Sequence, residues 1–218
     1  MSAADQQALI RRAKEGSVQA FGELVMLHQD RLYRFLLSRS GARADAEDAM
    51  QEAFVSAFRY LRSYDARWQF STWLYRIALR ELGKVVARHA GTRTVRESEA
   101  DTAADPLAAC IAADQRKNLW LTARNVLGEQ AYTALWLRYA EDMPVRDVAR
   151  VMGRPATWVK VVVHRARRRL ADVLATTSSG AQADKKAGSE VAGGAGQGHA
   201  LPRGARAVRC TAAIKERP

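Results

Sequence analysis

Apolar residues recur along most of the first 174 positions at intervals of three and four, the spacing of one face of an α-helix. Alternating apolar and polar runs, which are typical of β-strands, are nearly absent. One helical stretch covers residues 5–37, and Ser17 can cap it. The next begins at Asp45, a predicted cap with Asp48 three residues on, and keeps its pattern for four turns. The pattern predicts an all-α fold.

The periodicity breaks at residues 63–71, where aromatic and polar residues are mixed, and helix resumes at Ser71 or Thr72 and is expected to end near residues 89–91. Acidic residues and a proline within residues 92–113 favour a flexible acidic linker. Beyond position 175 the chain has no aromatic residue and holds seven of its 14 glycines. Such a segment buries too little surface to offset its ordering entropy, so it is predicted to be disordered.

These boundaries predict two small helical domains joined by a flexible acidic linker, with a helix-turn-helix in the second domain. The first domain is expected to span residues 1–91, the linker 92–113, the second domain 114–175 and a disordered basic tail 176–218.

The helix-turn-helix is predicted near residues 144–164. Ala149 lets two helices approach closely, Gly153 follows four residues later and supplies a turn with positive φ, and the buried Val159 comes six residues after that. No acidic residue occurs between Gly153 and Asp172. A helical hairpin with a solvated basic face is the alternative. Because turn spacing, core pattern and charge bias coincide, DNA binding is favoured.

Composition supports a polyanionic partner, because the 218 residues carry a formal net charge of +12. An anionic membrane surface is the other candidate, but the helix-turn-helix core accounts better for the apolar face of residues 157–174. Cys110 and Cys210 lack metal-ligand spacing, so no metal, cofactor or disulfide framework is expected. The chain shows no signal peptide and no apolar run of ~18 residues. We therefore expect a cytoplasmic protein without membrane insertion.

Two blocks of sequence carry a resemblance to a known family. Residues 45–54 and 70–78 form the first block, and residues 134–170 form the second. In this order, with a linker between them, they resemble the extracytoplasmic-function (ECF) group of bacterial RNA polymerase sigma factors, over about residues 8–174. The resemblance implies a non-catalytic subunit that binds core RNA polymerase and directs promoter-specific initiation of transcription. It also implies that an anti-sigma protein is a partner.

The resemblance further implies roles for individual residues. The acidic helix would dock on a coiled coil of the polymerase β′ subunit through Asp48, Gln51 and Glu52, although a solvated helix face is the alternative. The first domain would open the minus-ten element, with bases stacking on aromatic and Arg side chains, and Trp68 is the best candidate for exposure. The expected minus-ten contacts are Arg67, Trp68, Thr72, Tyr75, Arg76 and Arg80.

The second domain would read the minus-thirty-five element and touch the flap of the polymerase β subunit. The expected contacts are Arg154, Pro155, Ala156, Thr157, Lys160, Val161, His164, Arg165, Arg167 and Arg168.

Three departures from the family pattern affect these surfaces. Arg80 stands where the family usually has Asn, and Gly83-Lys84 where an Asp is typical. Val161 and Val162 follow Lys160 in place of a Ser-Arg pair. Val161 cannot donate a hydrogen bond to a base edge, so the resemblance does not determine the promoter preference of this chain.

Two other classes of protein remain open. A helix-turn-helix regulator that acts without core polymerase would bind duplex DNA by itself and would use its first domain to dimerise or sense a ligand. A DNA-processing enzyme would need a nucleophile with clustered arginines or a carboxylate cluster for metal ions. Ser71 and Tyr75 have no such supporting constellation, so no enzyme is expected.

Overall fold

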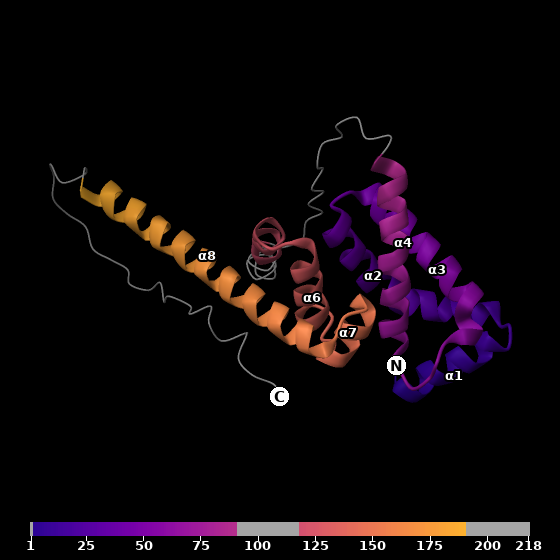
Figure 1. Cartoon of the computed structure of the whole chain (residues 1–218). Coiled ribbons are helices and arrows are strands. Elements are labelled where there is room, and N and C mark those ends of the chain that lie inside the picture. Colours follow the sequence, from indigo (N-terminus) through magenta and orange to yellow (C-terminus); the bar gives the residue numbers. More distant parts are fainter. Residues whose placement is uncertain (1, 91–117, 191–218) are drawn as a thin grey trace, which may run out of the picture. The chain divides into compact units, whose positions relative to one another are not determined.

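A computed structural model describes residues 2–90 and 118–190 of the chain, with side chains as far as residue 175. Residues Met1–Ala175 form one compact unit and Thr176–Pro218 form another. The described residues are helical and contain no strand, which confirms the predicted all-α class (Figure 1). The helices are α1 (Ala3–Lys14), α2 (Val18–Ser40), α3 (Arg43–Tyr60), α4 (Phe70–Ala90), α6 (Glu129–Tyr139), α7 (Val145–Met152) and α8 (Ala156–Glu190), with a 3₁₀ turn at Leu61–Ser63 and a further helical segment at 118–126.

The stretch predicted as one helix over residues 5–37 is divided into α1 and α2. Gly16 lies between them with φ 103°, a backbone conformation that residues with a Cβ atom rarely adopt. Ser17 then caps α2, because its Oγ accepts a hydrogen bond of 3.2 Å from the backbone N–H of Ala20. The predicted cap at Ser17 is therefore confirmed, and the prediction of a single helix is wrong at Gly16.

The predicted cap at Asp45 is wrong. Helix α3 begins two residues earlier, at Arg43, with Ala42 in the N-cap position. Asp45 is instead buried in the first turn, with 3% of its surface exposed. Its Oδ1 lies 2.7 Å from Nδ1 of His89, at the far end of α4. A capping carboxylate must face the backbone of its own helix, whereas this one faces a partner 44 positions away in the sequence.

The core of the first half is built from α2, α3 and α4, which contact one another. Helix α3 contributes a run of fully buried alanines, and such small side chains allow neighbouring helices to approach closely. Larger side chains from α2 and α4 fill the space between the helices, and the rings of Phe35 and Tyr75 lie 5.0 Å apart. The alanines are Ala46, Ala49, Ala53 and Ala57, and the larger fully buried residues include Leu32, Phe35, Leu36, Leu74 and Val85.

Helices α6, α7 and α8 supply further core residues, among them Leu137, Val148 and Val159, all fully buried. The indoles of Trp120 and Trp136 lie 4.6 Å apart beside them. Helix α8 continues to Glu190, whereas the sequence predicted an irregular tail from residue 176. Residues 176–190 contain no proline that would stop the helix. Extending an existing helix by one residue fixes only that residue's backbone and adds one hydrogen bond, so it costs less than starting a new helix. The predicted linker at 92–113 and the tail beyond residue 190 lie outside the described residues.

Candidate functional site

The turn between α7 and α8 is closed by backbone hydrogen bonds around Gly153. Gly153 has φ 63° and ψ 34°, as the sequence predicted for this glycine. Its N–H donates to the carbonyl of Arg150 at 3.2 Å, and the N–H of Arg154 donates to the carbonyl of Ala149 at 2.9 Å. These two bonds form a Schellman motif, which ends a helix and redirects the chain. The predicted helix-turn-helix geometry is confirmed.

One face of α8 is buried and the other is exposed. Val159, Val163, Ala166 and Leu170 are buried, in agreement with the predicted apolar stripe. Nine of the ten residues expected to read DNA are exposed, and Arg167 is half-buried with its guanidinium 5.8 Å from the ring of Tyr139. The exposed residues are Arg154, Pro155, Ala156, Thr157, Lys160, Val161, His164, Arg165 and Arg168. The structure thus brings the predicted set together on one cationic surface suited to phosphate contact.

The loop between the 3₁₀ turn and α4 is organised by Tyr64 and Asp65. The buried Tyr64 donates a hydrogen bond from its hydroxyl to the carbonyl of Trp68. Asp65 accepts from Nε of Arg67 at 2.8 Å and from its backbone N–H at 3.0 Å. These bonds lower the pKa of the Asp65 carboxyl to about 2. Arg67 is exposed. Trp68, which was expected to be exposed, is instead half-buried, because the guanidinium of Arg150 lies over its ring.

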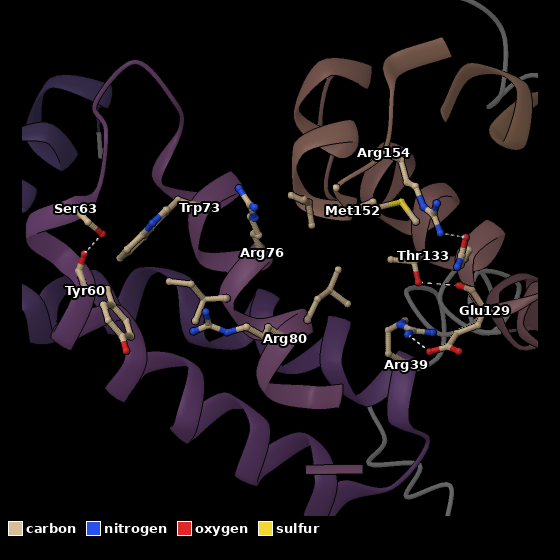
Figure 2. A pocket seen from close by; sticks show the side chains of 15 residues that line it. Arg39, Tyr60, Ser63, Trp73, Arg76, Arg80, Glu129, Thr133, Met152 and Arg154 are labelled. Atoms are coloured by element: carbon tan, nitrogen blue, oxygen red, sulfur yellow. Dashed lines mark hydrogen bonds and ion pairs between the residues drawn. The ribbon is translucent and has the colours of Figure 1, made fainter. Parts of the chain in front are cut away.

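Two predicted minus-ten residues, Arg76 and Arg80, are exposed on α4 and line a groove of about 730 Å³. Tyr60 and Trp73 line the same groove, whose other lining residues include Met152 and Arg154 (Figure 2). Figure 2 also shows the ion pair between Arg39 and Glu129, both of which line the groove. Aromatic rings next to guanidinium groups form a combination that suits the stacking of bases and the binding of phosphates.

Thr72 and Tyr75, by contrast, are placed in the interior, with 3% and 2% of their surfaces exposed. Burial raises the pKa of the Tyr75 phenol, and the neighbouring carboxylate of Glu141 adds to this effect. The expectation that both side chains lie on the exposed face of α4 is therefore corrected. Helix α4 contacts α2, α3 and α7, so its buried arc is wider than the single apolar stripe assumed from the sequence.

A buried acid on α4 was missed by the sequence reasoning. Glu81, 4% exposed, accepts hydrogen bonds from Oγ of Ser56 at 3.2 Å and from Nη2 of Arg80 at 3.1 Å. It also forms an ion pair with Lys84 at 2.8 Å. Burial acts to raise the pKa of Glu81, but the hydrogen bonds from Lys84 and Arg80 outweigh it, and the pKa is lowered. The i, i+3 spacing of Glu81 and Lys84 was the one signal of this pairing in the sequence.

The acidic face of α3 is accessible to a partner. Gln51 and Glu52 are exposed, and Asp48 is half-buried with its Oδ2 3.6 Å from Nε2 of His89. Val55 and Phe58, one and two turns further along α3, are exposed apolar residues. This helix therefore presents an acidic surface that is continuous with an apolar one.

Within residues 2–90 and 118–190, no group of three His, Cys, Asp or Glu side chains is placed to hold a metal ion. Over the same part of the chain, no helix combines the length and the apolar character that a membrane crossing requires.

Comparison with known proteins finds a family match for each half of the chain. Residues 24–92 match the family model Sigma-70 region 2, and residues 120–170 match Sigma-70, region 4. The ECF RNA polymerase sigma-E factor of Haemophilus influenzae is 29% identical over 177 residues, covering 74% of this chain and 90% of that protein. The ECF RNA polymerase sigma factor SigW of Bacillus subtilis is 26% identical over 172 residues, covering 74% and 92%.

Among solved structures, the sigma factor RpoE of Bartonella quintana, crystallised with the anti-sigma factor NepR, aligns with a TM-score of 0.55 and 25% identity. This alignment covers 72% of this chain and 98% of that one. The two matched segments contain, respectively, the acidic helix α3 and the helix-turn-helix of α7 and α8.

Proposed function

The chain belongs to the ECF group of bacterial RNA polymerase sigma factors. From this premise we propose which partner each of its surfaces binds. As a sigma factor it binds core RNA polymerase and directs promoter-specific initiation of transcription. The observation that supports this assignment of partners is the separation of charge. An exposed acidic helix lies in the region 2 segment and an exposed cationic helix in the region 4 segment.

The minus-thirty-five element is bound by the exposed face of α8. The N-terminal turns of a recognition helix enter the major groove, and this helix begins at Ala156, directly after the Gly153 turn. Lys160, Arg165 and Arg168 supply cations for phosphates and base edges. Met152 and Gly153 lie at the turn before α8 and fix the angle at which this helix enters the major groove. They do not need to contact the bases.

The minus-ten element is bound around the loop before α4 and the exposed side of that helix. Arg67 and Trp68 lie in the loop, and Arg76 and Arg80 lie on the helix. Unstacked bases of the opened strand gain counter-charge from the arginines, and a base that stacks on Trp68 takes the place of the Arg150 guanidinium that lies over its ring. Thr72 and Tyr75 act from the interior by holding α4 in place, since both are buried.

The acidic face of α3 binds the polymerase β′ subunit through Asp48, Gln51 and Glu52. A surface of this charge repels DNA phosphates, so its presence in a chain of net charge +12 favours a protein partner over nucleic acid. The chemistry of transcription stays with the core enzyme, and this chain supplies recognition without catalysis, in the cytoplasm where the polymerase works.

An anti-sigma protein is the regulator we propose, because the similar RpoE of Bartonella quintana was crystallised with its anti-sigma factor NepR. Affinity purification of the full chain from uninduced cells should recover a protein whose binding excludes core polymerase. Recovery of core polymerase with no such competitor would contradict this part of the proposal.

Glu52→Arg tests the docking face. We expect it to weaken binding to core polymerase by about tenfold or more, because it places a cation where an acidic surface meets its partner. Glu23→Arg, the same change at an exposed position of α2, is the control and should leave the affinity unchanged. Titration of labelled chain with core polymerase measures both.

The same preparation separates the sigma factor from a helix-turn-helix regulator. The chain alone should bind duplex DNA weakly, and specific binding should require core polymerase. Tight, sequence-specific binding by the chain alone, with equal core affinity for the Glu52→Arg variant and the parent, would favour the regulator.

A further inference from the structure

Val161 is an exposed apolar side chain at the centre of the cationic face of α8. Its exposed fraction is 47%, whereas Val159 and Val163 on the same helix are buried. Valine is a poorer helix former than alanine or the long polar residues, and an exposed valine that packs on no core contributes little to stability. A single exposed valine is common on protein surfaces, and what distinguishes Val161 is its place among the cationic side chains of this face.

Helix geometry places Val161 opposite the buried stripe. At ~100° per residue it lies about 200° around the helix from the buried Val159, so it points away from the buried face of α8. It is the sixth residue of α8, which begins at Ala156, and it lies in the first two turns. The N-terminal residues of a recognition helix are the ones that contact base edges in the major groove.

The neighbours of Val161 on the helix surface are polar or cationic. Thr157 and Arg165 lie one turn before and after it, and His164 lies beside it; all three are exposed. These groups suit phosphates and hydrogen-bonding base edges. Val161 offers two methyl groups and no donor or acceptor. The base feature that matches such a side chain in the major groove is the C5-methyl of thymine, which contacts apolar side chains.

We propose that Val161 determines specificity by packing against the C5-methyl group of a thymine in the minus-thirty-five element. This inference rests on the proposed function, since it assumes that the exposed face of α8 enters the major groove. Loss of the contact should cost about fourfold in affinity, the equivalent of ~0.8 kcal/mol for one buried methyl-sized group.

Replacement of thymine by deoxyuridine tests the contact directly, because it removes the C5-methyl group and leaves Watson–Crick pairing intact. Holoenzyme assembled from core polymerase and the full chain would first be used to select promoters from random upstream sequences. Each thymine of the enriched minus-thirty-five element would then be replaced singly, and holoenzyme affinity measured. We expect an approximately fourfold loss at one thymine with the parent chain, and no loss at that position with Val161→Ser.

Two further variants complete the design. Val161→Thr keeps one methyl group and should show an intermediate penalty. Val18→Ser makes the same change at an exposed position of α2 and should keep the full penalty. Circular dichroism checks that each variant folds.

The inference is overturned if the enriched element contains no thymine, if no thymine is sensitive to deoxyuridine, or if the penalty persists in Val161→Ser. Absence of any chain-dependent promoter selection would instead contradict the proposed function, and the inference would fall with it.

Discussion

Leu32 and Leu27 lie on the same helix, α2, but differ in burial. Leu32 is fully buried and Leu27 is 40% exposed. We expect Leu32→Ala to lower the free energy of unfolding by about 2–5 kcal/mol, because it removes buried methyl groups and leaves a cavity. Leu27→Ala should lower it by less than about 1 kcal/mol. Urea unfolding followed by circular dichroism measures both, and equal losses would show that the core is placed wrongly around α2.

The pairing of Asp65 with Arg67 predicts a pH dependence at low pH. The folded pKa of Asp65 is about 2, below its ordinary value of 3.8, because Arg67 donates hydrogen bonds to the carboxylate. The carboxylate therefore stabilises the fold fully above pH 3.8, and this contribution is lost as the pH falls toward 2.

Arg67→Ala should raise the pKa of Asp65 toward 3.8, as measured by the carboxyl carbon chemical shift in an NMR titration. Arg62→Ala, a neighbouring exposed arginine, should leave it unchanged. If the pKa of Asp65 were unchanged in Arg67→Ala, a group other than Arg67 would be responsible for lowering it.

Residues whose role is decided by their sequence neighbours were predictable. Ser17 as a cap, Gly153 with positive φ and Val159 in the core each depend on a few adjacent positions. Asp45 and Tyr75 were placed wrongly because their surroundings come from distant helices: Asp45 meets the end of α4, and Tyr75 is covered from α2 and by Glu141. Local spacing contains no information about such partners.

At the scale of elements, helical period was sufficient to find α2, α3, α4, α7 and the start of α8, but it did not fix where helices begin and end. The break at Gly16 and the extension of α8 to Glu190 were both missed. Helix ends depend on caps and on small differences in propensity, which are weak compared with the burial of an apolar stripe.

Substitution by alanine should change the stability of the fold in opposite directions at two glycines, Gly153 and Gly83. Gly153 has φ 63°, and a Cβ there meets no atom within 4 Å, so the cost of Gly153→Ala is conformational. We expect a loss of about 1–2 kcal/mol. Gly83 lies inside α4, also with open space, and Gly83→Ala should stabilise by about 0.5–1 kcal/mol. Denaturant unfolding of both variants measures the difference, and the same sign for both would contradict the left-handed turn.

For the whole molecule, the distribution of charge links the structure to the function. The chain is strongly basic, yet the exposed face of α3 is acidic, and the exposed face of α8 carries no acidic residue from Arg154 to Ala171. A sigma factor must bind core polymerase and read a promoter at the same time, and we propose that the acidic surface serves the first task and the cationic surface the second.

The central claim is that this chain gives core RNA polymerase its choice of promoter. Transcription from a library of random upstream sequences, with purified core polymerase and with or without the chain, tests it most directly. We predict initiation that depends on the chain and enriches two sequence elements separated by a constant spacing. Initiation that is equal with and without the chain, or that enriches no sequence, would contradict the claim.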